Sequence, residues 1–314
     1  AGIVAGQSDK ILEVISEVTP AQRAEIRVYL ADHPIVVKPA EGDKVFDILI
    51  TLRAGNNHVK LRISDYHTHI VYIEKNGEVL LNKPFSEEAA QPPESRRSLT
   101  VEDIIAFADE VDLDDVRAPI ARQIEYNTAI AEAGLTGQYG AAIGKILLDS
   151  YGDSVQNRAK AWAAAGSDAR MNGCEKPVVI NSGSGNQGMT ASLPVIVYAR
   201  ELKASEEQLY RALVVSNLVT IHLKTGIGSL SAYCGATSAG AGAGAGVCYL
   251  YGGRYDEIAH TIVNALAINS GMLCDGAKAS CAAKIASAVE AGLLGLQMYR
   301  HDSQFYGGDG IYWV

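Results

Sequence analysis

A run of alternating glycine and alanine, GATSAGAGAGAG at residues 235–246, constrains the fold of this chain more than any other stretch. Glycine inside a helix is less stable than alanine by about 1 kcal/mol per residue, so this density implies that backbones approach each other closely there. The run matches no phosphate-binding loop, because such loops end in Lys followed by Ser or Thr. We therefore expect a buried, close-packed helix or loop.

The first third of the chain changes its hydrophobic period. Ser8 and Thr19 are candidate N-caps of two opening helices, the second of which begins with Pro20. Between about residues 34 and 82, apolar and polar residues alternate, with turn signals at 55–57 and 76–77. This pattern predicts an antiparallel meander that begins with IVVKP at 35–39 and includes HVKLRIS and THIVYIE.

A polar segment at residues 86–98 separates this region from a second one, in which nearly every segment has helical spacing. Thr100 is the candidate N-cap of its first helix. The sequence predicts an α+β fold: a small α+β domain over residues 1–95, with N-terminal helices and a small antiparallel sheet, followed by an all-helical, cluster-binding domain over residues 96–314.

Composition limits the classes of partner. The formal net charge of −9 argues against nucleic acid and anionic membranes, and no stretch of 18 uninterrupted apolar residues suggests a transmembrane span. The opening AGIVAGQSDK lacks the features of a signal peptide, and five cysteines, an odd number, do not suggest a disulfide framework. We expect reduced thiols, a cytoplasmic location and a small-molecule partner. The Ala- and Gly-rich helices suit packing between subunits of a homo-oligomer as well as packing within one subunit.

All five cysteines lie in the helical region, where a small buried thiol can simply be a packing residue. Three of them lie beside Gly or Asp in loop-like contexts, and none shows the C-x2-C spacing of a zinc site. Three thiolates without a fourth suit a [4Fe-4S] cluster whose remaining iron acts as a Lewis acid. The candidate ligands are Cys234, Cys274 and Cys281, with packing as the alternative.

A polar loop, NSGSGNQG, precedes an apolar helix-like run. Such a loop can direct backbone N–H groups at a carboxylate or a phosphate, although Gly, Ser and Asn are also common in ordinary turns. Upstream, Arg170 can pair with a substrate carboxylate or form a salt bridge with Asp168. The candidate substrate-binding residues are Arg170, Asn181, Ser182, Gly183, Ser184, Gly185, Asn186 and Gln187.

Two histidines, His67 and His69, lie two positions apart, which places them on the same face of a predicted strand. Such a pair can bind a metal or act as acid and base. Exposed strand histidines without a chemical role are the alternative.

Four segments, SDARMNG, NSGSGNQGMTASLPV, SAYCGATSAGAGAGAG and SGMLCDGAKASCAAK, together resemble the iron–sulfur L-cysteine desulfidases, their uncharacterised relatives and the alpha chain of iron–sulfur L-serine dehydratases. The resemblance implies that Cys234, Cys274 and Cys281 hold a [4Fe-4S] cluster with an open iron that binds the substrate. It implies β-elimination from L-cysteine or L-serine, as in amino-acid catabolism. His67 falls on the family's His-Thr-x-Ile segment and becomes the catalytic candidate, whereas His69 stands where relatives can carry Asn.

The family also has an upstream Gly-Cys-Thr-Glu-Pro segment, which this sequence lacks, and its members continue beyond the position of Gly310. We therefore expect a fragment without the family's proposed base. The alternatives to an active lyase are a non-catalytic cluster- or metabolite-binding sensor module and an inactive fragment of such a lyase. A cluster with an exposed iron is oxygen-labile, so we expect it to be absent from protein prepared in air.

Overall fold

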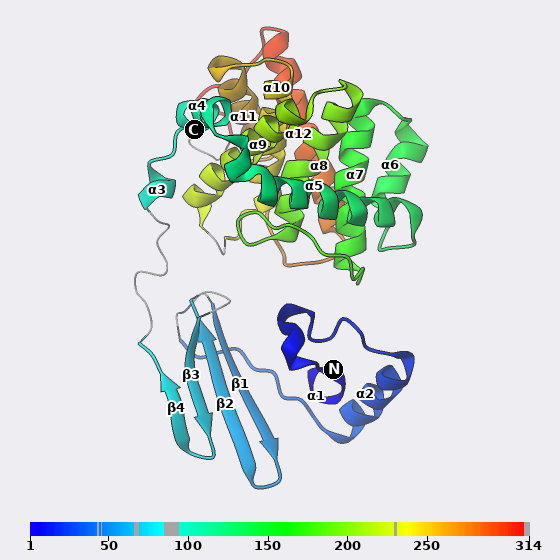
Figure 1. The fold of residues 1–314 in the computed structure, drawn as a ribbon, viewed down its shortest axis with the longest axis vertical. Helices are drawn as coiled ribbons and strands as arrows, with labels where there is room; N and C mark the ends of the chain where they lie inside the picture. Colours follow the sequence, from blue (N-terminus) through cyan, green and yellow to red (C-terminus); the bar gives the residue numbers. More distant parts are fainter. Residues whose placement is uncertain (43, 45, 66–68, 85–93, 229–230, 311–314) are drawn as a thin grey trace. The chain divides into compact units, whose positions relative to one another are not determined.

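The computed structural model describes residues 1–314 except 43, 45, 66–68, 85–93, 229–230 and 311–314, and it leaves the side chains of 11–13 out. The chain divides into two compact units, Ala1–Gln91 and Pro92–Val314 (Figure 1). One contains a small sheet and the other consists of helices, which confirms the predicted α+β class.

The first unit opens with α1 (Gly2–Ala5), the 3₁₀-helix η1 (Ser8–Glu13) and α2 (Pro20–Asp32). Thr19 caps α2 as predicted, in a reciprocal capping box with Gln22. The predicted α-helix from Ser8 is wrong, because Ser8 is the first residue of a short 3₁₀-helix that ends at Glu13. The residues that follow η1 explain this, since VISEV at 14–18 is rich in β-branched side chains and serine, which have low helix propensity.

The sheet has four antiparallel strands in the order β1 (Asp47–Ala54), β2 (Asn57–Ser64), β3 (Ile70–Lys75) and β4 (Glu78–Asn82). Asn76 and Gly77 join β3 to β4 with φ angles of 53° and 87°, the left-handed pair that a tight hairpin requires. The meander is confirmed, but the predicted first strand, IVVKP, is wrong. Ile35, Val36 and Val37 lie outside any strand and are exposed; Pro39 removes one hydrogen-bond donor from that segment.

The second unit is formed by ten helices in the described part of the chain. Thr100 caps the second of them, as predicted, by accepting a hydrogen bond from the amide of Asp103. The helices are α3 (Glu94–Arg97), α4 (Val101–Glu110), α5 (Leu113–Thr136), α6 (Ile143–Tyr151), α7 (Val155–Met171), α8 (Gly185–Glu201), α9 (Glu206–Ile227), α10 (Gly235–Leu250), α11 (Tyr255–Ile268) and α12 (Cys281–Arg300).

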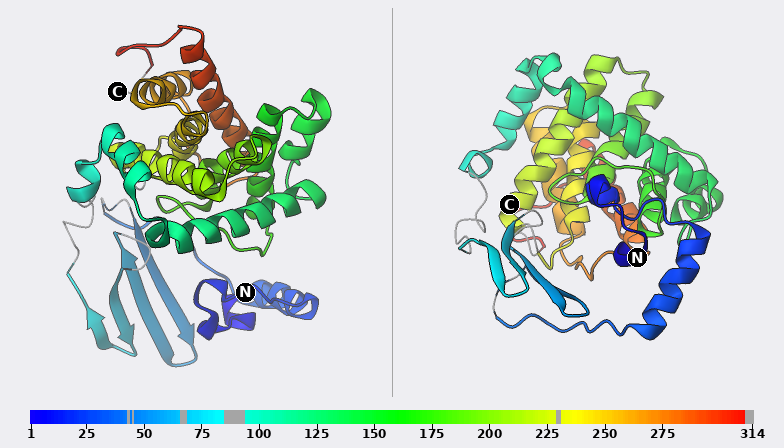
Figure 2. Two further views of the ribbon diagram at one scale, coloured as in Figure 1. Left: turned by 45° about the horizontal axis from the view of Figure 1, so that its top comes forward. Right: turned by 60° about the horizontal axis from the view of Figure 1, so that its bottom comes forward.

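The Gly/Ala run forms α10, a helix that is buried over most of its length and packs against α8, α9, α11 and α12 (Figure 2). Its glycines allow backbone contact on two sides. A Cβ atom on Gly240 would lie 2.2 Å from the carbonyl oxygen of Ala288 in α12, and one on Gly242 would lie 2.3 Å from Oγ1 of Thr220 in α9. The expectation of a buried, close-packed element is confirmed, and the element is a helix.

Within the residues that the structure describes, no helix combines the length and the apolar character that crossing a membrane requires.

Candidate functional site

Cys234 and Cys274 lie on neighbouring segments, although they are distant in sequence. Tyr233 and Leu273 form an antiparallel bridge. On either side of it, the amide of Cys234 donates to the carbonyl of Met272 at 3.0 Å and the amide of Cys274 donates to that of Ala232 at 2.7 Å. Cys234 is buried at the N-cap of α10, whereas Cys274 is exposed. The backbone therefore fixes two of the predicted ligands beside each other.

Cys281 is the first residue of α12, and its Sγ lies 3.5 Å from the amide nitrogen of Lys278. The pKa of Cys234 is raised, chiefly by burial, and negative charge on Cys274 or Cys281 raises it further. The backbone amide of Ala236 and the charge of Lys284 act in the opposite direction and lower this pKa. The three sulfur atoms are thus near enough to interact electrostatically. Cys234 lies at the N-cap of α10, Cys281 is the first residue of α12, and Cys274 lies in the loop between α11 and α12.

The donor set fits an inorganic cluster better than a single ion. In the ranges that the structure describes, no three His, Cys, Asp or Glu side chains converge tightly enough to hold one metal ion. A four-iron cluster spaces its thiolates more widely, because each thiolate binds a different iron. Three gathered cysteines therefore suit a cluster that keeps one iron open.

Two lysines lie beside these thiols. Lys224, in the last turn of α9, is 6% exposed; burial lowers its pKa, and the neighbouring Cys234 and Cys274 act in the opposite direction. Lys284 of α12 donates to Oδ1 of Asp275 at 2.5 Å and to the carbonyl of Leu273 at 3.0 Å. Lys284 therefore ties the loop that carries Cys274 to the helix that begins with Cys281.

The NSGSGNQG loop is a tight turn that leads into α8. Ser182 and Gly183 have φ angles of 48° and 82°, and Ser184 caps α8. The side-chain amide of Asn181 donates to Oδ1 of Asn217 at 2.9 Å and to its carbonyl at 3.2 Å. Asn181 thus holds the loop against α9, and its N–H₂ group is already committed to that contact.

Arg170 extends across the start of α8. A Cβ atom on Gly185 would lie 2.5 Å from Nε of Arg170, and Nη1 of Arg170 donates to Oδ1 of Asn186 at 3.4 Å. The salt bridge between Arg170 and Asp168 that we considered does not form, since the Asp168 carboxylate instead accepts from the amide of Gly144 at 3.3 Å. The pKa of Arg170 is lowered, because the effect of burial exceeds the opposite effect of the nearby Cys281.

Gln187 connects this loop to the thiols. A Cβ atom on Gly235, the residue after Cys234, would lie 2.5 Å from Cδ and Nε2 of Gln187. Gln187 is 8% exposed, and its Oε1 has no hydrogen-bond partner among the residues described. Such an atom can accept a hydrogen bond from a bound ligand.

His67 lies outside the described residues. His69 precedes β3 instead of lying within it, so its predicted position on a strand is wrong; the strand begins at Ile70. Its Nδ1 is 3.1 Å from the carbonyl oxygen of Ser64 and 3.5 Å from Oδ2 of Asp65. Local contacts within the first unit therefore occupy this imidazole.

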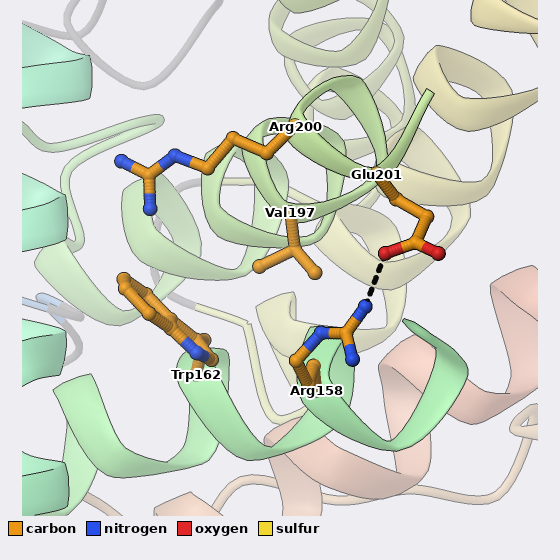
Figure 3. Close-up of a pocket in the computed structure, with 5 residues that line it drawn as sticks. All are labelled: Arg158, Trp162, Val197, Arg200 and Glu201. Carbon is orange, nitrogen blue, oxygen red and sulfur yellow. Dashed lines mark hydrogen bonds and ion pairs between the residues drawn. The ribbon is translucent and has the colours of Figure 1, made fainter. Parts of the chain in front are cut away.

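A separate hollow of about 190 Å³ lies at the opposite ends of α7 and α8 from Arg170 and Gln187 (Figure 3). The guanidinium of Arg158 pairs with Glu201, and that of Arg200 lies 5.2 Å from the ring centroid of Trp162. These groups already have partners within the protein. The hollow is therefore distinct from the thiol site.

The comparison with known sequences identifies the family. The family model described as serine dehydratase alpha chain matches residues 9–311. The chain belongs to the serine dehydratase alpha-chain family. A UPF0597 protein of Desulfitobacterium hafniense is 62% identical over 99% of this chain and 72% of its own length, and one of Lachnoclostridium phytofermentans is 48% identical over 99% and 74%. No solved structure matches.

In this member of the serine dehydratase alpha-chain family, the sequence reasoning missed Lys224 and Lys284. Lys224 follows the largely apolar stretch LVVSNLVTIHL at 213–223. A charged residue at the end of such a stretch was the available signal, because lysine is almost never fully buried without a reason. Lys284 had no comparable signal.

Proposed function

We propose that this protein is a lyase that catalyses β-elimination from a small L-amino acid. L-Serine would yield pyruvate and ammonia; L-cysteine, with water, would yield pyruvate, ammonia and hydrogen sulfide. Membership of the serine dehydratase alpha-chain family supports the reaction class. The observation that carries the proposal is that Cys234, Cys274 and Cys281 gather beside Arg170 and the unpartnered amide oxygen of Gln187.

Cys234, Cys274 and Cys281 would hold a [4Fe-4S] cluster. When bound, such a cluster supplies a Lewis acid that polarises the substrate. The deprotonated form of a thiol is the form that binds metal. Lys284 keeps Cys274 in place through Asp275 and Leu273, so the ligand loop does not depend on the cluster alone for its position.

Arg170 and the loop from Asn181 to Gln187 would bind and orient the amino acid. The Arg170 guanidinium has no carboxylate partner in the described part of the chain, so it is available to a substrate carboxylate. Oε1 of Gln187 can accept a hydrogen bond from the substrate ammonium. Asn181 acts through the loop, since Asn217 holds its amide.

Elimination also requires a base for the proton on Cα and an exit for the group on the β-carbon. His67 remains our candidate base, because an imidazole titrates near neutral pH. Loss of the α-proton and the β-substituent gives aminoacrylate. Its imine tautomer hydrolyses in water to pyruvate and ammonia.

Anaerobic reconstitution with iron and sulfide, followed by assays of pyruvate, ammonia and sulfide from L-serine and L-cysteine, tests this function. We expect turnover of at least one substrate, and loss of turnover in R170M and H67A. A reconstituted cluster with no elimination from either amino acid would refute the proposal.

A second candidate is a metabolite-binding module without catalysis. It is favoured by a loop that already carries binding groups, among them Oε1 of Gln187, which has no partner among the described residues. Calorimetry separates the two candidates. A sensor would bind L-serine or L-cysteine and leave it unchanged, whereas the lyase would release pyruvate.

A further inference from the structure

The sheet of the first unit has two outer strands, β1 and β4 (Figure 1). Natural outer strands are usually short, irregular or charged, since an exposed strand edge can pair with another chain. β4 fits this rule, because it has five residues and its register with β3 shifts after Ile73. β1 does not fit it, because its eight residues pair with β2 in an unbroken register and include neither Pro nor Lys. β1 is therefore an edge on which another strand can pair.

No described helix or strand covers the outer side of β1. Among the elements in the described part of the chain, β1 contacts only β2. All of its residues except Asp47 are exposed, and Ile48, Ile50 and Leu52 have exposed fractions of 41%, 44% and 51%. An outer strand that exposes isoleucine and leucine is a surface suited to association.

The hydrogen bonds of β1 to β2 fix which of its residues face outwards. The amide of Asp65, just after β2, donates to the carbonyl of Phe46, just before β1, at 3.0 Å. These two residues continue the register of β1 and β2, and hydrogen-bonded pairs alternate along an antiparallel ladder. The two-residue turn at Gly55 and Asn56 has the same phase, since the residues that flank such a turn form a hydrogen-bonded pair. The even-numbered residues of β1 therefore bond to β2, and its odd-numbered residues point their N–H and C=O groups away from the sheet.

A second copy of β1 can bond to these outward groups if odd-numbered residues lie opposite odd-numbered residues. Two antiparallel β1 strands meet this condition when a two-fold axis passes beside Ile50. Leu49 then lies opposite Thr51 of the other copy, and the two residues exchange both backbone hydrogen bonds. Asp47 lies opposite Arg53 of the other copy, so opposite charges meet at both ends of the contact. A pairing centred on Leu49 or Thr51 loses this match of charges.

The same register brings apolar side chains together. Ile48, Ile50 and Leu52 lie on one face of β1, because side chains alternate along a strand. Ile50 lies opposite its own copy in this register, and Ile48 lies opposite Leu52 of the other copy. These are non-hydrogen-bonded pairs, in which side chains approach most closely. Hydrogen bonding, charge and apolar contact thus favour one and the same register.

We propose that β1 pairs antiparallel with β1 of a second copy of this chain, about a two-fold axis at Ile50. The two four-stranded sheets then form one continuous sheet. Each copy uses its β1 edge in this contact, and the short, irregular β4 does not extend the sheet, so the assembly stops at two chains. The proposal concerns the first unit and does not depend on the reaction proposed above.

Cysteine cross-linking tests the register directly, with cluster-free protein oxidised in air and analysed on a non-reducing gel. Cα atoms in a non-hydrogen-bonded pair are about 4.5 Å apart, which a disulfide can span. I50C should therefore yield a covalent dimer well above the wild-type level.

I48C is the matched control, because residue 48 and its own copy lie about 13 Å apart in this register. I48C alone should cross-link no more than wild type, whereas a mixture of I48C and L52C should form a covalent dimer. An I50C variant that cross-links no more than I48C would contradict the proposal.

Sedimentation equilibrium tests the dimer itself. Wild type should have the mass of two chains. I50K places two ammonium groups beside the axis and should raise the dissociation constant of the dimer tenfold or more. V79K is the control, since Val79 lies on the other outer strand with an exposed fraction of 50%, and V79K should associate as wild type does.

Two results would overturn the proposed dimer. A wild-type protein with the mass of one chain would leave β1 to a strand of a different protein. An I50K variant as dimeric as wild type would place the interface elsewhere on the molecule.

Discussion

Substitution of Gly240 by alanine should destabilise the helical unit, although alanine is the better helix former. The added Cβ would lie 2.2 Å from the carbonyl oxygen and 2.5 Å from the carbonyl carbon of Ala288. Both are backbone atoms of α12, so no side-chain rotation relieves the contact. The two helices must separate by roughly 1 Å to restore an ordinary carbon–oxygen contact.

The magnitude follows from two opposing effects. Overpacking of this kind costs typically 1–3 kcal/mol, and more where backbone must move. The helix propensity gained from alanine is about 1 kcal/mol. Because the contact involves two rigid helices, we place the cost at the upper end and expect G240A to lower the free energy of unfolding by about 2 kcal/mol.

Urea denaturation followed by circular dichroism at 222 nm measures this change. The matched control is G226A in α9, where a Cβ atom would have no heavy atom within 4 Å. G226A should be neutral or stabilising by up to about 1 kcal/mol. If G240A is as stable as wild type, or if both variants shift equally, the close approach of α10 and α12 is not what requires glycine.

Three further predictions concern titration, thiol reactivity and the loop. Hydrogen bonds from Tyr72, Lys60 and His58 lower the pKa of Glu74 from 4.5 to about 2, so their stabilising effect is complete above pH 4.5 and is lost as pH falls towards 2. Acid unfolding of the sheet, followed by far-ultraviolet circular dichroism, should therefore depend less on pH in E74Q than in wild type. Identical pH profiles for the two proteins would contradict this. Iodoacetamide at pH 8 should label exposed Cys274 first and leave Cys248 unlabelled, since burial raises the pKa of Cys248 to about 12. Peptide mass spectrometry identifies the order of labelling, and early labelling of Cys248 would contradict the prediction. N217A should release the loop, because the side-chain amide of Asn181 donates to Asn217. The amides of residues 181–184 should then exchange hydrogen faster, and KM for the amino acid should rise several-fold. Unchanged exchange would show that α9 does not hold the loop.

Much of the fold follows from local pattern. Strand alternation with the Asn76-Gly77 turn predicts the hairpin, and the caps at Thr19 and Thr100 mark helix starts that the structure contains. The errors arose where local pattern competes with context. IVVKP has the composition of a strand but forms none, and a β-branched stretch stops the helix expected from Ser8.

The site was less accessible to sequence reasoning. Spacing left packing open as an alternative for Cys234, Cys274 and Cys281, and the resemblance to a known family singled them out as ligands. The bridge between Tyr233 and Leu273, which brings two of these cysteines together, depends on tertiary packing. Burial of Lys224 likewise depends on neighbouring helices, and the commitment of Asn181 to Asn217 depends on α9. Such contacts join residues that are distant in sequence, so no local pattern reveals them.

The central claim is that three thiols share one inorganic centre. Iron and acid-labile sulfide analysis after anaerobic reconstitution tests it most directly, with C234S, C274S and C281S compared against C248S, which alters a cysteine buried elsewhere on α10. We predict about four irons and four sulfides per chain in wild type and C248S, as a [4Fe-4S] cluster requires, and a large loss in each of the other three variants. A wild-type protein that binds no iron, or a C274S variant that retains the full complement, would contradict the account.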